Sequence, residues 1–158
     1  VGRLGTLFSA FDTETERLGL EKIKTIGDAY MVAAGVPDPC PDHAGAAAEL
    51  GLALRSTLGR LNAEQEWNFG IRIGIHSGPL VAGVIGEQRF SYDVWGDTVN
   101  TASRMESHGA PGQIQVSEAT RSRLEARYLF EDRGEMEIKG KGPMRTFFLL
   151  GAKDGHSP

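Results

Sequence analysis

Two polar residues, Asn100 and Arg104, lie four positions apart in residues 97–107, a segment with helical spacing. Side chains at positions i and i+4 of a helix project from the same face, so one amide and one guanidinium would lie side by side. An asparagine amide can donate to and accept from a sugar, and the planar fork of arginine suits phosphate oxygens. The pair indicates a nucleotide site, although an exposed polar helix face with Arg104 paired to Glu106 or another carboxylate gives the same pattern.

Three charged residues on predicted strands or in the turn between them, Lys24, Asp28 and Asp93, add groups of the kind that a nucleotide site needs. Asp93 lies near the end of an otherwise apolar strand. Its carboxylate can accept a hydrogen bond from the exocyclic amine of adenine, or it can accept hydrogen bonds from the neighbouring turn instead. Strand alternation places Lys22, Lys24 and Asp28 on one face, where both lysines would equally serve as solvated charges. Asp28 follows Gly27 at a strand turn, where it can reach Mg²⁺ or act as an ordinary turn residue.

A sixth candidate, Lys139, lies in the glycine-rich segment Ile138-Lys139-Gly140-Lys141-Gly142. Glycines let the backbone and an ammonium approach a polyphosphate, although a hairpin with solvated lysines has the same composition. The segment is not a P-loop, because the sequence lacks the pattern Gly-x-x-x-x-Gly-Lys-Ser/Thr. The four histidines have no metal-ligand spacing and there is one cysteine, so the sequence predicts no zinc site.

Length and composition limit the classes of protein that the chain can belong to. Its 158 residues fit one globular domain, and a net charge of -4 argues against non-specific nucleic-acid binding by the whole surface. The single cysteine, Cys40, can form no internal disulfide, which favours a cytoplasmic setting. No apolar run approaches the roughly 18 residues of a membrane helix. We therefore expect no membrane contact by this domain, although an anchor elsewhere in a longer protein is compatible with it.

The elements that must position these residues alternate along the chain. Amphipathic spacing predicts helices over 3–18, 43–62, 97–107 and 118–126, the last with Ser117 as its N-cap. Strand and turn signals predict strands over 20–26, 29–34, 69–77, 80–85, 90–94, 113–116, 128–132, 135–139 and 144–150. A proline-rich loop lies between, and residues 151–158 are predicted to be a disordered tail. The order of elements predicts an α+β or α/β sandwich in which helices cover a mixed sheet.

Three segments are informative because of their amino-acid sequences and their order along the chain. They read EKIKTIGDAYM (residues 21–31), YDVWGDTVNTASRM (92–105) and KGKG (139–142). On these segments the chain resembles the class III nucleotidyl cyclase catalytic domain, and it is most similar to bacterial homodimeric adenylyl cyclases related to the mammalian enzymes. The resemblance implies one catalytic domain over residues 1–150, with an α+β, ferredoxin-like sandwich, a mostly antiparallel mixed sheet and a protruding dimerisation hairpin over residues 83–96.

For the base and the metal, the resemblance implies three roles. Lys24 and Asp93 match the pair that reads adenine, at positions where guanylyl cyclases typically have Glu and a small residue such as Cys. Guanine presents the reverse polarity to this pair, and each buried group left unpaired costs about 1–3 kcal/mol. Asp28 matches the second of the family's two metal aspartates. The first lies on a strand that precedes the first helix, and we expect it upstream of Val1, since this sequence lacks its pattern.

For the sugar and the phosphates, the resemblance implies that Asn100 positions the ribose, Arg104 stabilises the transition state at the α-phosphate and Lys139 holds the terminal phosphates. The implied reaction converts ATP to 3′,5′-cyclic AMP and pyrophosphate, assisted by two Mg²⁺ or Mn²⁺ ions per site. The implied assembly is a head-to-tail homodimer with shared sites. The alternatives are a guanylyl cyclase with the same fold, or a catalytically inactive module for nucleotide binding or dimerisation.

Overall fold

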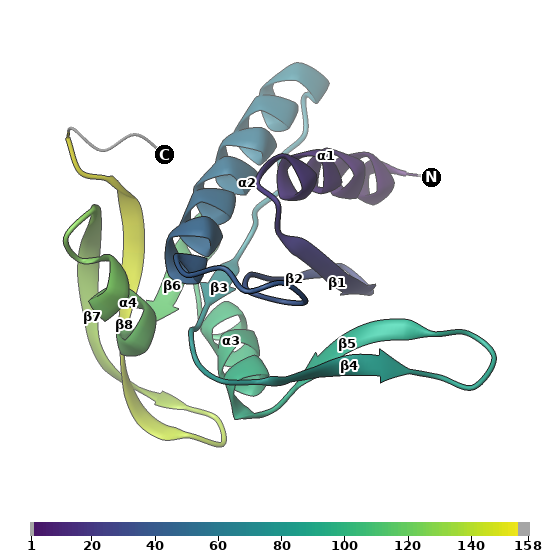
Figure 1. Cartoon of the computed structure of the whole chain (residues 1–158). Helices are drawn as coiled ribbons and strands as arrows, with labels where there is room; N and C mark the ends of the chain where they lie inside the picture. Colours follow the sequence, from purple (N-terminus) through teal and green to yellow (C-terminus); the bar gives the residue numbers. More distant parts are fainter. Residues whose placement is uncertain (1, 155–158) are drawn as a thin grey trace. The chain divides into compact units, whose positions relative to one another are not determined.

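The computed structural model describes residues 2–154 of the chain, which form helices α1–α4 and strands β1–β8 (Figure 1). Contacts divide the chain into two compact units. The first unit contains residues 1–69 and 81–95, and the second contains residues 70–80 and 96–158. Within the described residues, every helix is too short or too polar to cross a membrane.

The first unit contains two antiparallel strand pairs and two helices. The bounds are α1 (Arg3–Arg17), β1 (Glu21–Ile26), β2 (Ala29–Ala33), α2 (His43–Gln65), β4 (Val81–Ile85) and β5 (Ser91–Trp95). β1 pairs with β2 through the predicted turn at Gly27-Asp28, and β4 pairs with β5. α1 packs against α2 and β1, and its core residue Phe11 is almost fully buried.

The helix α2 shows how the sequence sets the boundaries of an element. The carboxylate of Asp42 accepts a hydrogen bond from the backbone N–H of Gly45 and so caps the first turn. The helix ends after Gln65, three residues beyond the predicted end, and Glu66 takes a left-handed conformation there. Leucines at helical spacing are buried along one face, as predicted: Leu50, Leu54, Leu58 and Leu61.

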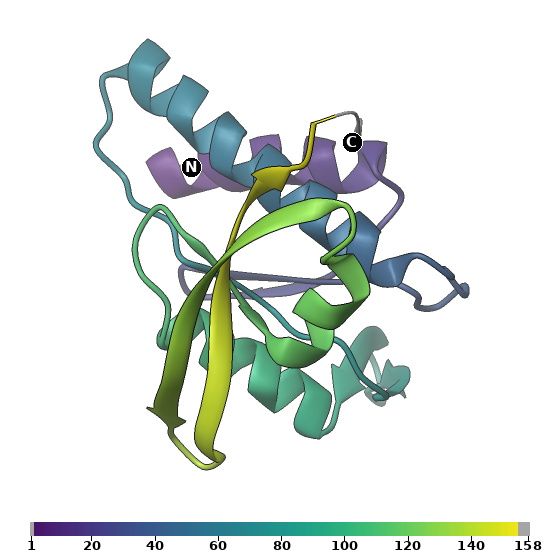
Figure 2. The same ribbon diagram turned by 90° about the vertical axis from the view of Figure 1, so that its left-hand side faces the viewer.

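The second unit contains a four-stranded sheet in the order β3-β6-β8-β7. Its elements are β3 (Ile73–Ile75), α3 (Asp97–Ser107), β6 (Ile114–Ser117), α4 (Glu118–Leu124), β7 (Tyr128–Ile138) and β8 (Gly142–Ala152). β3 and β6 are parallel, and the other pairs are antiparallel. Figure 2 shows β7 and β8, coloured green and yellow, as a long twisted ribbon. Ser117 caps α4 as predicted, because its hydroxyl accepts from the N–H of Thr120.

Helix α3 has the predicted bounds, and it packs closely on β3 because Gly74 has no side chain. A Cβ at Gly74 would overlap the backbone nitrogen of Glu106 and would lie 2.6 Å from the carbonyl carbon of Met105. Both of these atoms belong to α3. The position of the helix that carries Asn100 and Arg104 therefore depends on a glycine in the strand beneath it.

Three predictions about strands were wrong. β3 contains only Ile73–Ile75 of the nine predicted residues 69–77. The strands predicted over 128–132 and 135–139 are one strand, because Gly134, with φ of 77°, makes a bulge inside β7 and does not end it. The tail predicted over 151–158 is wrong at its start, where β8 continues to Ala152. Its last four residues, 155–158, lie outside the described residues.

Candidate active site

The six candidate residues belong to both units of the fold. The first unit contains Lys24, Asp28 and Asp93, and the second contains Asn100, Arg104 and Lys139. The surroundings of each residue are described within its own unit.

Lys24 of β1 and Asp93 of β5 form an ion pair, in which Lys24 Nζ donates to Asp93 Oδ2 at 2.9 Å. The other carboxylate oxygen, Oδ1, accepts from the backbone N–H of Val94 at 2.8 Å. The hydrogen bonds from Lys24 and from Val94 lower the pKa of the Asp93 carboxyl. Asp93 is therefore ionised at neutral pH and presents a carboxylate acceptor beside an ammonium donor.

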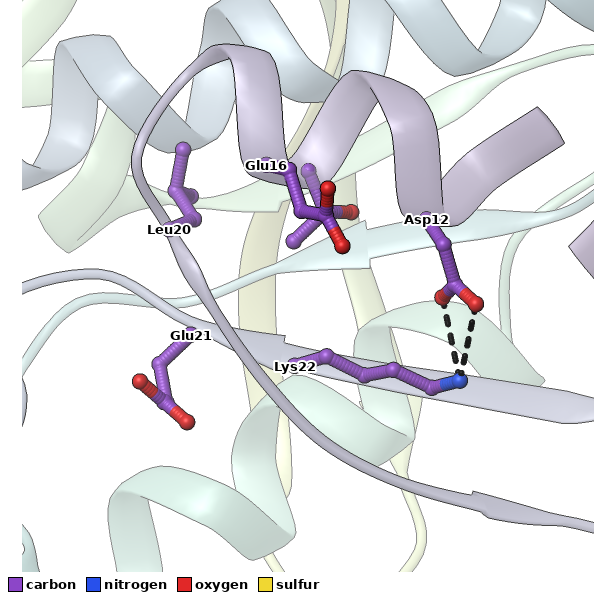
Figure 3. Close-up of a pocket in the computed structure, with 6 residues that line it drawn as sticks. Asp12, Glu16, Leu20, Glu21 and Lys22 are labelled. Carbon is purple, nitrogen blue, oxygen red and sulfur yellow. Dashed lines mark hydrogen bonds and ion pairs between the residues drawn. The ribbon is translucent and has the colours of Figure 1, made fainter. Parts of the chain in front are cut away.

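The prediction that Lys22 and Lys24 share a face was wrong, because β1 has a register shift between them. Lys22 binds Asp12 of α1 at 3.0 Å, and its ammonium lies 5.2 Å from the centre of the Tyr30 ring. Figure 3 shows Lys22 and Asp12 at a pocket of about 330 Å³. Because of this bulge, Lys22 binds Asp12 of α1 and Lys24 binds Asp93 of β5.

Asp12 has a structural role in this arrangement. Tyr30 Oη donates to Asp12 Oδ1 at 2.6 Å, and the Thr15 hydroxyl lies 3.2 Å from the same Tyr30 oxygen. Burial alone would raise the pKa of Asp12, but the hydrogen bonds from Tyr30 and Lys22 outweigh it, and the pKa is lowered. Burial, followed by the hydrogen bond to Asp12, raises the pKa of Tyr30. The carboxylate of Asp12 is thus already used in holding α1 to β1 and β2.

Asp28 is exposed in the turn between β1 and β2, directly after Gly27, whose φ is 59°. Its carboxylate has no hydrogen-bond or ion-pair partner among residues 2–154. Within the same residues, no group of three or more His, Cys, Asp or Glu side chains is placed to hold a metal ion. Asp28 therefore offers one oxygen ligand, and the described residues do not complete a metal site by themselves.

Asn100 and Arg104 lie one turn apart on α3, which begins after Gly96 with its φ of 121°. Asn100 is exposed and Arg104 is half-buried. In the part of the chain that the structure describes, neither side chain has a hydrogen-bond or ion-pair partner. The alternative that Arg104 pairs with Glu106 was wrong, because Glu106 binds Arg72, with 2.9 Å between Oε2 and Nε.

Lys139 and Lys141 have different surroundings in the turn between β7 and β8. Lys139 is exposed, and its backbone N–H donates to His108 Nε2 at 3.4 Å. The Lys139 ammonium has no partner among the described residues. The Lys141 ammonium instead binds Asp97, with Oδ2 at 2.6 Å. Sequence reasoning missed this pair, because no local pattern signals a contact between residues 44 positions apart.

The comparisons with known proteins identify the family. Residues 1–151 match the model of the adenylate and guanylate cyclase catalytic domain. The chain belongs to this class III cyclase family. The resemblance inferred from the three segments is thereby confirmed.

The relatives include cyclases named for each nucleotide. The chain is 47% identical over 155 residues to an adenylate cyclase of Mycobacterium bovis, covering 98% of this chain and 35% of that protein. It is 43% identical over 153 residues to a membrane guanylyl cyclase of Dictyostelium discoideum, covering 97% of this chain and 10% of that protein. The chain thus spans about a third of the first relative and a tenth of the second.

Solved structures agree with the fold. The guanylate cyclase domain of RhGC from Catenaria anguillulae, in complex with GTP, is 37% identical, with a TM-score of 0.90. The match covers 95% of this chain and 82% of that one. The predicted α+β class, with mostly antiparallel strand pairing, is confirmed.

Proposed function

We propose that this cyclase domain is an adenylyl cyclase, which converts ATP to 3′,5′-cyclic AMP and pyrophosphate. The observation that carries the proposal is the 2.9 Å ion pair between Lys24 and Asp93. The exocyclic amine of adenine needs an acceptor, which the ionised Asp93 supplies, and a ring nitrogen of adenine can accept from Lys24. Guanine has the opposite polarity at these positions, and each polar group left unpaired would cost about 1–3 kcal/mol.

Three residues of the second unit supply groups that suit the rest of the nucleotide. In the proposed reaction, the ribose 3′-oxygen attacks the α-phosphorus and pyrophosphate leaves. Asn100 orients the ribose, Arg104 stabilises the charge that develops at the α-phosphate, and Lys139 binds the terminal phosphates. The proposal is supported by the absence of any competing partner for these three side chains among residues 2–154.

Class III cyclases are metal-dependent. We propose Asp28 as one ligand of two Mg²⁺ or Mn²⁺ ions per site, since its exposed carboxylate has no partner among the described residues. When bound, such ions supply positive charge beside the phosphates. The identity of the ion is part of the proposal, and no residue role above depends on it.

The proposed active assembly is a head-to-tail homodimer. Large apolar side chains are exposed on β4, β5 and the turn between them, with Phe90 73% and Val81 65% exposed. Apolar groups gathered on one exposed hairpin favour its use as an interface. This hairpin contains residues 83–95 of the predicted dimerisation segment 83–96.

A guanylyl cyclase is the second candidate, because the relatives include guanylyl cyclases at similar identity. The two candidates predict different products from the same assay. The full-length protein is incubated with ATP or with GTP in the presence of Mn²⁺, and each cyclic nucleotide is quantified. Cyclic AMP as the main product, lost on Arg104→Ala, supports the proposal. Cyclic GMP as the main product contradicts it, and no product from a folded sample that binds ATP indicates an inactive nucleotide-binding module.

A further inference from the structure

Side chains from the β7–β8 hairpin bind both ends of helix α3. At the first residue of the helix, Asp97 Oδ2 accepts from Lys141 Nζ at 2.6 Å. At the other end, the carbonyl oxygen of His108 accepts from Arg133 Nη1 at 3.1 Å. All four residues belong to the second unit. We name these contacts, together with those of Gln115 below, the hairpin–helix clasp.

The C-terminal end of the clasp is a buried polar network. Gln115 of β6 is fully buried, donates through Nε2 to the carbonyl oxygen of Met105 at 2.9 Å and accepts from Arg133 at 2.6 Å. The last carbonyl oxygens of a helix have no partner inside it, so these donors satisfy acceptors that would otherwise stay unpaired. The Arg133 guanidinium also lies 4.4 Å from the centre of the Phe148 ring. Strand β7 is thereby attached to the end of α3 next to Arg104.

The N-terminal end of the clasp is an exposed ion pair. Asp97 is the first residue of α3, where a negative charge is favoured by the helix dipole. Its side chain is 76% exposed, whereas that of Lys141 is 23% exposed. Exposed pairs contribute little to the free energy of folding. The pair has a larger effect on the position of the turn that carries Lys139, because Lys141 lies only two residues after Lys139 in the same short turn.

We propose that Asp97, Lys141 and Arg133 are positioning residues, which hold the turn that carries the Lys139 ammonium in one place relative to Asn100 and Arg104 on α3. The inference rests on the proposed function, in which these three groups bind one nucleotide. Lys139 lies between Arg133 and Lys141 along the hairpin, and its own N–H reaches His108. A misplacement of about 1 Å can slow a reaction on the order of 100-fold, so a weak contact can matter for rate.

The decisive variants break the exposed pair and leave Lys139 in place. In the full-length protein, we expect Asp97→Asn and Lys141→Gln each to lower kcat for cyclic AMP formation by about tenfold, with little change in melting temperature. The double variant should be no slower than either single variant, because both remove the same contact. Lys141→Arg should retain most of the activity. Arg133→Gln should lower kcat in the same direction, with a loss of stability as well.

A matched control lies on the same hairpin. Asp132 and Arg145 form an ion pair of 3.0 Å between β7 and β8, with both side chains 47% exposed, and this pair does not involve α3. Arg145→Gln should leave kcat unchanged. If Asp97→Asn is fully active while Lys141→Gln is inactive, Lys141 contacts substrate itself and the positioning role is wrong. Effects that multiply in the double variant would overturn it as well.

A readout besides activity separates this inference from the proposed function. Amide hydrogen exchange of residues 139–142 should become faster in Asp97→Asn than in the wild type, whether or not the protein makes cyclic AMP. A wild type that makes no cyclic nucleotide contradicts the proposed function alone. Unchanged exchange in this turn would overturn the clasp as a positioning device, even in an active cyclase.

Discussion

Two pairs of like-charged residues show how the structure distinguishes a candidate site residue from its neighbour. The ammonium of Lys141 is bound to Asp97, while that of Lys139 has no partner among the described residues. The guanidinium of Arg72 is bound to Glu106, while that of Arg104 has no partner within the same part of the chain. In each pair, one cation is already bound to a carboxylate of the protein and the other is available for an anionic ligand.

This difference predicts separate effects on rate and on stability. Arg104→Ala should lower kcat by a factor on the order of 100 or more, because the loss of a charge that acts in the transition state costs about 3–4 kcal/mol. The melting temperature should stay nearly constant, since no described residue is paired with the guanidinium. Steady-state kinetics and thermal unfolding measure both quantities. Arg72→Ala is the control, and it should keep kcat; a stable, fully active Arg104→Ala protein would remove Arg104 from the mechanism.

The base-reading pair predicts a change of substrate. In the double variant Lys24→Glu, Asp93→Cys, the acceptor for the adenine amine is lost and a carboxylate replaces the ammonium. Each mismatched polar group costs about 1–3 kcal/mol, so the ratio of kcat/KM for ATP over GTP should fall by a factor on the order of 10 to 100 per position. The measurement is the initial rate with each nucleotide. An unchanged ratio in a folded variant would show that these residues do not read the base.

At the scale of the element, β1 and β7 show where reading the sequence succeeded and where it failed. The turn at Gly27-Asp28 was predicted, because glycine and aspartate have local reasons to be in turns. The register shift after Lys22 was not, because a bulge depends on which residues the partner strand offers. Gly134 was taken as the end of a strand, whereas long-range pairing with β8 keeps β7 continuous across it.

The packing of α3 on β3 predicts opposite effects for two glycine-to-alanine changes. Gly74→Ala forces a Cβ against the backbone of α3, which we expect to destabilise the fold by about 1–3 kcal/mol and to lower kcat by moving Arg104. Gly59→Ala is the matched control, because Gly59 lies within α2 and a Cβ there meets no atom within 4 Å. This change should stabilise the fold by about 0.5–1 kcal/mol. Chemical denaturation measures both, and equal stabilities would contradict the packing argument.

At the scale of the whole chain, the sequence predicted the order of elements and the family, because both depend on local patterns and on three long segments. The sequence predicted which residues are candidates for the site, but it did not predict which side chains these residues contact. The pair of Lys24 and Asp93 joins residues 69 positions apart, and that of Asp97 and Lys141 joins residues 44 apart. Periodicity contains no information about such pairs. The resemblance named the first pair through its role with adenine, and nothing in the sequence named the second.

The stability of the chain should depend on pH through His76. Its Nδ1 shares a 2.6 Å hydrogen bond with the hydroxyl of Ser117, which also caps α4, and Ser77 and Thr120 share a buried hydrogen bond beside it. Burial, followed by the charge of Lys141, lowers the pKa of His76; Arg123 acts in the same direction and Asp97 opposes them. A histidine whose pKa is lower in the folded state binds more protons when unfolded, so folding stabilises its neutral form.

This difference in pKa determines whether stability rises or falls with pH, and over which pH range it changes. The contribution of His76 to stability is complete above its pKa in the unfolded chain, about 6.5. It is lost as the pH falls through the lower pKa that His76 has in the folded protein. The lowered pKa values of Asp12, Asp93 and Asp132 affect stability only in more acidic solution, because their ordinary value is 3.8. Urea denaturation between pH 7.5 and 5 should therefore show a decreasing free energy of unfolding in the wild type. The decrease should be smaller in His76→Gln, and a parallel decrease in both proteins would assign the effect to other groups.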